Sequence, residues 1–533
     1  MTGAPSLRRW FWTVLAVVLA FRLWFAWWLP FTGDEAYFLT WARAPDLGFY
    51  DHPPMIGWML AGLLEVSQSA LWLRLPSVLL PALIAVGMVA LIRALAGSNM
   101  DSERIAYAGA LAWMLVPAQV VNVLVTTDTP LIAFSALAMG AFAVAVRRDS
   151  TAAYVAAGAA LGLAFLSKYF ALLVGLAFAV FALASSLARD PTAPRIWRGV
   201  AVTVLALAPF ALVNLAWNYG HCWTNVLFNV YNRHDEARLR WWRPFEFAAL
   251  VVYVSSPILL WQLARDHAAL RSLGAVREWR LLATLALAPL AVFAAIAPFR
   301  DVGLHWLFSF MAPLFAAGAL ALGADRLLTS VKYLATLSAA HVALALTVAA
   351  VPIETFQWLP QYNSMVQTAK ADELLAALKA YEGKYLLAAN SFSRAARLSY
   401  AAARANFVTQ PQAPEAWRRH YVFVLGSTSH HGRQDDIFTD ARTLEGRDVL
   451  VVQKQPADLQ QYRRWFRAVA LRDIEIGGTT FHLVLGHDFD FAAYRESLLA
   501  QVRDRYYRVP RILDRGHCYF CQRYFGTRTC PLR

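Results

Sequence analysis

The chain has 533 residues, of which 59% are hydrophobic and only 16% charged, and its mean hydropathy is +0.42. Soluble domains carry roughly 25% charged residues, so this composition excludes an ordinary soluble protein. The formal net charge of +14 does not indicate nucleic-acid binding, because the arginines lie in short loops between apolar runs and not on one amphipathic face. The composition predicts a polytopic α-helical membrane protein.

Apolar runs long enough to cross a hydrocarbon core of about 30 Å recur along the first two thirds of the chain. The first, from Trp10 to Pro30, is similar to a signal sequence, but no small-residue cleavage site follows it and we expect it to be retained. The sequence therefore predicts about eleven transmembrane helices. The other ten are expected near residues 77–96, 105–124, 129–146, 152–166, 169–188, 199–217, 244–263, 280–298, 306–323 and 332–353.

The basic residues predict the orientation of these helices. Cytoplasmic loops of membrane proteins carry an excess of arginine and lysine, and Arg8 and Arg9 precede the first span. Five later loops on the same side of an alternating topology are also basic: Arg93 with Arg104, Arg147 with Arg148, Arg189 with Arg195 and Arg198, Arg265 through Arg280, and Arg326 with Lys332. The connections near residues 31–76, 125–128, 167–168, 218–243 and 299–305 are then predicted to be periplasmic.

The composition changes abruptly after Pro352. The sequence predicts two domains, a transmembrane domain at residues 1–353 and a soluble α/β domain at residues 354–533, which an odd number of spans places in the periplasm. Helical spacing and short apolar runs predict helices at Ala371–Tyr381 and Arg394–Ala403 and strands at Tyr385–Ala389, Tyr421–Leu425, Val449–Val452 and Phe481–Leu485.

Short motifs of acidic, basic and aromatic residues follow one another along the predicted periplasmic connections. They are Gly33-Asp34-Glu35-Ala36-Tyr37, Trp41, Gly48-Phe49-Tyr50-Asp51-His52-Pro53-Pro54 with Trp58, Thr127-Asp128-Thr129-Pro130, Leu166-Ser167-Lys168-Tyr169, Trp217-Asn218 with His221 and Trp223, and His305-Trp306. Each motif is weak alone, but the ordered set on one membrane face is specific. It strongly resembles the GT-C glycosyltransferases, in the family that includes protein O-mannosyltransferases and the bacterial aminoarabinose transferase of lipid A.

The resemblance implies a GT-C-like glycosyltransferase of the bacterial inner membrane. Such an enzyme takes a sugar from a polyprenyl-phosphate-linked donor and transfers it, on the periplasmic face, to an acceptor hydroxyl or phosphate. Lipid A, a polysaccharide and a protein all stay open as acceptors, as do the sugar and the length of the polyprenyl chain. The sequence shows no dense acidic cluster of the kind a divalent cation usually requires, so no metal or other cofactor is indicated, although metal dependence stays open.

The expected chemistry needs few groups. A glycosyl phosphate carries a good leaving group, so the enzyme needs a general base for the acceptor and cations for the departing phosphate. Asp34 matches the first-loop aspartate of the family and is the candidate base, and Asp128 matches the second-loop aspartate and is expected to orient the acceptor or share the base role. One displacement inverts the anomeric centre, whereas retention would need Glu35 or Asp128 as a nucleophile.

The donor phosphate is expected to meet several cations. His52 stands where the lipid A branch has a lysine before the Pro-Pro pair, and its charge at neutral pH is open because histidine titrates near pH 6.5. Lys168 and Arg300 rank first among the other cations because they lie at predicted membrane boundaries, and Arg233 lies deeper in a loop. The remaining predicted contacts are Tyr50 and Asp51 to the donor and His221, Trp223 and His305 to substrate.

These residues also have structural interpretations. Asp34 and Glu35 would suit a solvated turn, and Asp128 would suit a helix N-cap. Lys168 would suit an interfacial lysine whose ammonium reaches the headgroups. His52 would suit a loop position without a role in binding. His221 and His305, beside tryptophans, would suit the aromatic belt at a membrane interface.

An alternative function is a non-enzymatic polyprenyl-lipid flippase or transporter, which would be expected to place ionisable residues inside its spans. Only a few are there, and Arg22 and His341 stand out.

The cysteines raise a separate question. Cys518, Cys521 and Cys530, with His517, are suitable ligands for zinc, but a periplasmic location favours a disulfide among the three cysteines. Cys222 is available for the odd thiol, and the connectivity is open.

Overall fold

The computed structural model describes residues 4–96, 100–232, 238–426, 432–514 and 516–533. The chain forms two compact units, which we call the helical unit and the mixed unit. The helical unit comprises Met1–Trp28, Leu71–Leu212 and Glu236–Ala350, and the mixed unit comprises Leu29–Ala70, Val213–Asp235 and Val351–Arg533. The last junction lies close to the predicted domain boundary at 353/354, but the mixed unit also takes in two earlier segments. Among them is the loop that holds Asp34 and His52.

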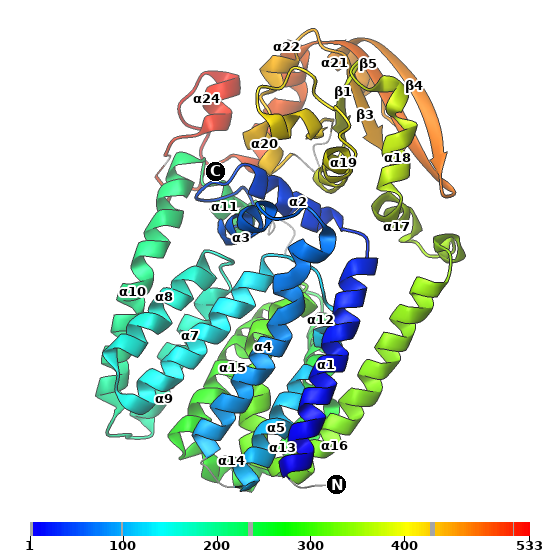
Figure 1. The fold of residues 1–533 in the computed structure, drawn as a ribbon. Helices are drawn as coiled ribbons and strands as arrows, with labels where there is room; N and C mark the ends of the chain where they lie inside the picture. The colour runs from blue at the N-terminus through cyan, green and yellow to red at the C-terminus, as the bar shows by residue number, and fades with distance from the viewer. Residues whose placement is uncertain (1–3, 97–99, 233–237, 427–431, 515) are drawn as a thin grey trace. The chain divides into compact units, whose positions relative to one another are not determined.

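The helical unit is built from long apolar helices (Figure 1). They are α1 (Ala4–Trp28), α4 (Ala70–Ala96), α5 (Met100–Met114), α6 (Pro117–Val121), α7 (Asp128–Arg148), α8 (Thr151–Phe165), α9 (Ala171–Leu187), α10 (Ala193–Gly220, which continues into the mixed unit), α12 (Arg243–Ser255), α13 (Pro257–Arg265), α14 (His267–Gly274), α15 (Arg277–Ile296), the 3-10 turn η2 (Leu304–Leu307) and α16 (Phe308–Ala350).

Each predicted apolar span falls on helical structure, but the number of spans differs from the prediction. Within the described residues, six helices are long and apolar enough to cross a membrane, or up to seven if α12 and α13, bent by 95°, form one span. Helices α8 and α9 are shorter, and α16 covers two predicted spans. Gly323, at φ 72° and ψ 174°, interrupts α16 because this conformation is not helical. The predicted count of eleven is therefore not confirmed.

Close packing holds the helices of this unit together. The rings of Phe142 in α7 and Phe178 in α9 stack with centroids 3.9 Å apart. Gly158 of α8 lies against α10, where an added Cβ would come within 2.3 Å of the carbonyl oxygen of Thr203. Small residues at such crossings allow helix backbones to approach closely, which is a common basis of helix association in membranes.

Ion pairs connect several of the loops predicted to be cytoplasmic. Arg104 pairs with Asp325, Arg326 with Asp266, and Arg280 with Asp190. These contacts bring together positions that are distant in the sequence, as expected if the loops share one face of the helical unit.

Arg22 of α1 is buried, and its guanidinium donates hydrogen bonds to backbone carbonyls. Its Nη2 lies 2.7 Å from the carbonyl oxygen of Ser77, and its Nη1 donates to the carbonyls of Gln119 and Val120 in the last turn of α6. Pro81 has no N–H to offer the Ser77 carbonyl, and helix ends leave their last carbonyls without intrahelical partners. Arg22 therefore satisfies carbonyls that the helices themselves leave unpaired.

His341 is also hydrogen-bonded within the helical unit. Its Nε2 lies 2.9 Å from the hydroxyl of Tyr253 and its Nδ1 lies 2.8 Å from the carbonyl oxygen of Leu337. Both ionisable residues that the sequence marked within spans thus have local structural partners, and they give no support to a transport pathway.

The mixed unit contains short helices and a sheet. Its helical elements are α2 (Gly33–Arg43), α3 (Met55–Leu64), α11 (Thr224–Val226), η1 (Leu227–Asn232), η3 (Ile353–Phe356), α17 (Tyr362–Ala369), α18 (Ala371–Ala377), η4 (Lys379–Tyr381), α19 (Phe392–Arg404), η5 (Ala416–His420), α20 (Gln434–Phe438), η6 (Ala441–Leu444), α21 (Leu459–Trp465), α22 (Phe491–Tyr494), η7 (Arg495–Leu499), α23 (Ala500–Tyr506) and α24 (Tyr519–Phe525).

The sheet has five strands in the order β2-β1-β3-β5-β4. They are β1 (Leu386–Ala389), β2 (Phe423–Val424), β3 (Val449–Gln453), β4 (Phe466–Ile476) and β5 (Thr479–Phe489). Strand β1 pairs in parallel with β2 and β3, and β5 pairs antiparallel with β3 and β4. The four predicted strands and the two predicted helices of this region are present, and the α/β character is confirmed.

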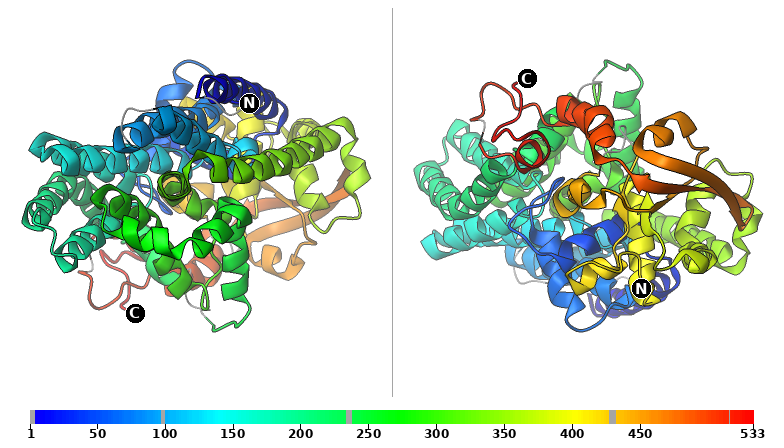
Figure 2. Two further views of the ribbon diagram at one scale, coloured as in Figure 1. Left: turned by 90° about the horizontal axis from the view of Figure 1, so that it is seen from below. Right: turned by 90° about the horizontal axis from the view of Figure 1, so that it is seen from above.

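Strand β4 escaped the prediction. It lies at the edge of the sheet, where most of its residues are exposed, and its short apolar run at 468–471 lies between Arg467 and Arg472. It joins β5 through Gly477 and Gly478, which both have positive φ, as the tightest hairpin turns require. Figure 2, right, shows the resulting β4–β5 hairpin in orange along one side of the sheet.

Two disulfides join the four cysteines within the mixed unit. Cys222 bonds to Cys518, and Cys521 bonds to Cys530. A disulfide among the three C-terminal cysteines, with Cys222 pairing the odd thiol, was among the predicted outcomes and is confirmed. Because zinc binds thiolates, the four cysteines in this bonded form do not provide the ligands of the alternative zinc site.

We expect non-reducing peptide mapping to recover the linked pairs Cys222–Cys518 and Cys521–Cys530. Replacing both Cys222 and Cys518 by serine should lower the melting temperature, because a disulfide that closes a long loop typically contributes about 2–5 kcal/mol. The matched control is the wild-type protein under reducing conditions. Recovery of a Cys518–Cys530 link in the wild type would contradict this pairing.

Candidate functional site

Asp34 and Glu35 occupy different environments at the start of α2. Thr32 is the N-cap, and its backbone N–H and hydroxyl both donate to Glu35 Oε2, at 3.0 and 2.9 Å. Glu35 is fully buried, whereas Asp34 in the same turn is exposed. This reciprocal capping box gives the Glu35 carboxylate a structural role, and the catalytic roles of Glu35 and Asp34 stay predictions.

The first turn of α2 lies directly on α19. An added Cβ at Gly33 would come within 2.0 Å of Ser393 Oγ, so only glycine fits this approach without movement. The aromatic rings of Tyr37 and Phe392 lie 4.9 Å apart on the same two helices. Figure 2, right, shows α2 in blue beside α19 in yellow. Asp34 is therefore held on a helix packed against the C-terminal part of the mixed unit.

Tyr50 and Asp51, both predicted donor contacts, are buried and bonded to protein groups. The backbone N–H of Tyr50 donates to Gln434 Oε1 at 2.8 Å. Asp51 accepts from the hydroxyl of Tyr37 at 3.1 Å through one oxygen and from Arg433 at 2.9 Å through the other. These contacts favour structural roles for both residues.

His52 follows this buried pair and is half-buried. Its carbonyl oxygen accepts from the backbone N–H of Phe49 at 3.0 Å, which closes the turn. Its ring centroid lies 6.3 Å from that of Trp41 and 6.4 Å from that of Phe38. The role of His52 at a phosphate stays a prediction.

The helical unit brings together three predicted site residues from different parts of the sequence. Lys168 Nζ lies 2.8 and 3.0 Å from the two carboxylate oxygens of Asp128, and both residues are buried. His305 Nε2 lies 3.8 Å from Asp128 Oδ2, and the His305 side chain is 52% exposed. This arrangement brings a carboxylate, an amino group and an imidazole together at the start of α7.

The alternative interpretations of Asp128 and Lys168 do not fit this geometry. Thr127 is the N-cap of α7 and Asp128 is its first residue, with its carboxylate turned to Lys168. Lys168 is buried beside that carboxylate, whereas an interfacial lysine would extend to the headgroups. Arg300 lies beyond the end of α15 and donates its backbone N–H to Ile296. Arg233 lies outside the described residues.

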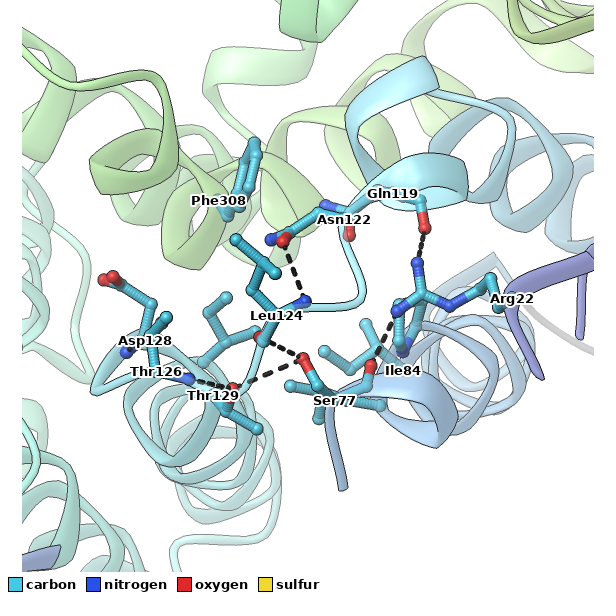
Figure 3. A pocket seen from close by; sticks show the side chains of 13 residues that line it. Arg22, Ser77, Ile84, Gln119, Asn122, Leu124, Thr126, Asp128, Thr129 and Phe308 are labelled. Atoms are coloured by element: carbon cyan, nitrogen blue, oxygen red, sulfur yellow. Dashed lines mark hydrogen bonds between the residues drawn. The ribbon is translucent and has the colours of Figure 1, made fainter. Parts of the chain in front are cut away.

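A small polar cavity adjoins Asp128 in the helical unit (Figure 3). It has a volume of about 20 Å³, which is room for about one water molecule. The residues around it are Arg22, Ser77, Leu80, Pro81, Ile84, Gln119, Asn122, Leu124, Thr126, Asp128, Thr129, Ile132 and Phe308. The cavity is too small for a sugar ring in this conformation, but it can hold a water molecule next to Asp128.

His221 and Trp223 lie near the first disulfide of the mixed unit. The imidazole of His221 stacks on Trp217 with centroids 4.3 Å apart, and its Nε2 lies 3.9 Å from Asp46 Oδ2. Trp217 donates its indole N–H to the same carboxylate at 2.9 Å. Trp223 is buried and donates its indole N–H to the carbonyl of Asp514. This bond favours a structural role for Trp223, and His221 stays a candidate substrate contact.

The sequence reasoning missed the segment that follows Gly432. Arg433 and Gln434 contact the first loop, and Asp435 accepts from Tyr421, Thr439 and the backbone N–H of Val424. Asp436 accepts from the hydroxyl of Tyr507 at 2.8 Å. No periodic or spacing pattern marks these residues, because their partners are distant in sequence.

The buried carboxyls of this segment make its stability depend on pH. Burial raises the pKa of Asp435 to about 6 and that of Asp436 to about 7. Hydrogen bonds from Tyr421 and Tyr507 oppose the increase but do not cancel it. The folded protein therefore keeps these protons at a pH where the unfolded chain has lost them.

We expect Asp436→Asn to reduce the pH dependence of unfolding. The raised pKa stabilises the folded state fully below about pH 4, and that contribution is lost as pH rises toward 7. The variant should therefore match the wild type near pH 4 and unfold a few °C higher near pH 8. Thermal unfolding across this range provides the measurement, with Asp372→Asn, an exposed carboxylate, as the control. Parallel curves for Asp436→Asn and wild type would contradict the buried acid.

Comparison of whole structures shows what kind of fold carries these residues. ArnT from Cupriavidus metallidurans in the apo state aligns with 89% of this chain and 97% of its own, at a TM-score of 0.59 and 16% sequence identity. The fold is that of a GT-C glycosyltransferase. ArnT from the same organism bound to undecaprenyl phosphate aligns with 89% of this chain and 98% of its own, at a TM-score of 0.55 and 16% identity.

Sequence comparison points to the same superfamily. Residues 51–217 match the family described as dolichyl-phosphate-mannose-protein mannosyltransferase. The lipid A galacturonosyltransferase RgtD from Rhizobium johnstonii is 32% identical over 263 residues, which cover 47% of this chain. The match spans about half of that relative, 54% of its length. The resemblance inferred from the loop motifs is thereby confirmed.

Proposed function

We propose that the protein transfers a sugar from a polyprenyl-phosphate donor to lipid A at the outer face of the bacterial inner membrane. The observation that carries this proposal is the fold shared over 89% of the chain with an ArnT solved bound to undecaprenyl phosphate. The sequence similarity to RgtD, a lipid A galacturonosyltransferase, supports lipid A as the acceptor.

Asp34 is the proposed general base. Its side chain is exposed, whereas those of Glu35 and Asp51 are buried. In the proposed step Asp34 takes the proton of the acceptor hydroxyl while the oxygen attacks C1 of the sugar. The bond from C1 to the phosphate oxygen breaks, and the polyprenyl phosphate leaves with that electron pair. A single displacement of this kind inverts the anomeric centre.

Lys168 is the proposed cation for the leaving phosphate, with Asp128 as the residue that positions it. The ammonium group has three N–H donors, and the carboxylate oxygens of Asp128 lie 2.8 and 3.0 Å from it. A fixed ammonium stabilises developing negative charge without reorganisation during the reaction. The proximity of His305 to Asp128 supports His305 as a further proposed substrate contact, and His52 and Arg300 are further proposed phosphate contacts.

Asp34→Asn should lower the rate of transfer by about 10²–10⁴-fold while leaving donor binding largely unchanged, because asparagine keeps the size but cannot accept the proton. Reconstituted protein with a polyprenyl-phosphate sugar and lipid A provides the assay. Asp372→Asn, which alters another exposed carboxylate of the mixed unit, is the control. Turnover near that of the wild type would remove Asp34 from the base role.

The proposed periplasmic orientation of the site rests on the different residues at the two ends of α7. Helix α7 has 21 residues. It therefore spans about 31 Å, close to the thickness of the hydrocarbon core. It begins at Asp128, beside Lys168, and ends at Arg147 and Arg148, whose charge favours the cytoplasm. The Asp128 end would then face the periplasm.

A cysteine introduced at Ser150, just beyond the basic end of α7, should resist a membrane-impermeant thiol reagent in intact cells. One introduced at Ser364, in the mixed unit, should react. The native cysteines are paired in disulfides, so the substitutions can be made in the wild-type sequence, with that protein as the unlabelled control. Reversed labelling would overturn the proposed orientation.

A further inference from the structure

The segment from Arg433 to Asp436 contacts two parts of the first loop within the mixed unit. Arg433 and Asp51 are 382 residues apart in sequence, and their charged atoms lie 2.9 Å apart. Gln434 accepts from the backbone N–H of Tyr50 at 2.8 Å and donates its own backbone N–H to the hydroxyl of Tyr37 at 3.1 Å. Two consecutive residues, Arg433 and Gln434, thus hold the loop through three contacts.

The guanidinium of Arg433 lies close to two aromatic rings. It lies 4.0 Å from the ring centroid of Phe392 and 4.9 Å from that of Phe228. The backbone of Arg433 has a φ of +56°, in the left-handed region that residues other than glycine rarely adopt. Such a conformation persists where surrounding contacts determine it, and here the ion pair and the two rings supply those contacts.

Asp51 connects the ion pair with Arg433 to Asp34 and His52, the two candidate residues of the first loop. Its side chain is 4% exposed, and its second oxygen accepts from Tyr37, three residues after Asp34 on α2. Its backbone carbonyl accepts from Asn229 at 2.7 Å, and His52 is its neighbour in the chain. Because residues three apart share a helix face, fixing Tyr37 also fixes the rotation of the turn that carries Asp34.

The charge of Arg433 has a second consequence. A buried carboxylate that loses a cation paired with it is strongly destabilising to its surroundings. An unneutralised Asp51 would also repel a phosphate bound beside His52, since like charges a few ångströms apart interact strongly at low dielectric. Arg433 therefore both orients the loop and neutralises it.

We propose that Arg433 is a positioning residue for the transfer reaction, with Asp51 as its counter-ion and not a donor contact. This inference rests on the proposed function, because it concerns the loop that presents Asp34. It assigns to the C-terminal part of the chain a role in the reaction without direct contact to substrate.

The test is a double-substitution cycle with Arg433→Gln, Asp51→Asn and both together. Arg433→Gln should lower kcat by about 10–100-fold, because it removes the guanidinium paired with the buried Asp51 carboxylate and lets the loop shift. Asp51→Asn should cost only a few-fold, since the amide oxygen still accepts from Tyr37. The double variant should be no less active than Asp51→Asn alone, because both charges of the ion pair are removed together.

The matched control is Arg442→Gln. Arg442 also pairs with an aspartate of the mixed unit, Asp440 at 2.7 Å, but its side chain is 54% exposed, so its loss should leave kcat unchanged. Equal losses from Arg433→Gln in the wild-type and Asp51→Asn backgrounds would overturn the proposal. So would a large rise in donor KM for Asp51→Asn, which would make Asp51 a donor contact.

Hydrogen exchange of the full-length protein provides a readout independent of activity. Arg433→Gln should accelerate exchange in α2 and at residues 49–52, and the double variant should restore protection. Unchanged exchange in α2 would contradict the positioning role whatever the kinetics. If the wild type transfers no sugar but Arg433→Gln still releases α2, the positioning contact stands and the proposed function fails.

Discussion

A charged group buried in a protein is costly unless another group neutralises it or bonds to it, and this constraint shapes both units of the chain. In the helical unit it pairs Lys168 with Asp128 and directs Arg22 to carbonyls that Pro81 and the end of α6 leave open. In the mixed unit it pairs Asp51 with Arg433. The buried charged groups are therefore also the groups that fix the geometry around them.

The same constraint separates the acidic residues of the first loop by role. The Glu35 carboxylate accepts hydrogen bonds from Thr32 in the capping box. The Asp51 carboxylate accepts from Arg433 and Tyr37. Asp34 lies on the exposed side of the first turn of α2. Asp34, Glu35 and Asp51 thus have three different environments. This difference, and not the presence of acidic residues, singles out Asp34 as the proposed base.

The mixed unit is assembled from segments that are far apart in the chain. The bond between Cys222 and Cys518 joins residues 296 positions apart in sequence. The contacts of Gln434 with Tyr37 and Tyr50 join residues that are still farther apart in sequence. The first loop is consequently packed in the same compact unit as the C-terminal sheet. A domain boundary drawn by composition near residue 353 cannot show this, because composition records where the chain becomes polar and not what it folds against.

The sequence alone was enough to predict the apolar helices, four of the five strands and the superfamily. Each of these depends on local patterns: the length of an apolar run, short buried strands, and motifs in order. It also placed Asp128, Lys168 and His305 on one face, and the structure brings them within contact of one another. Strand β4 was missed because it is an edge strand with mostly exposed residues, and its short apolar run at 468–471 lies between two arginines.

Only the tertiary structure decided which charges are paired and which carboxylates are exposed. Asp51 and Arg433 stand 382 residues apart, and nothing in the sequence around either residue indicates the other. The same is true of Lys168 with Asp128 and of the cysteine pairing. Local sequence determines the helices and strands because their hydrogen bonds and apolar faces repeat over a few residues, whereas the state of a buried charge depends on neighbours that the fold supplies from elsewhere in the chain.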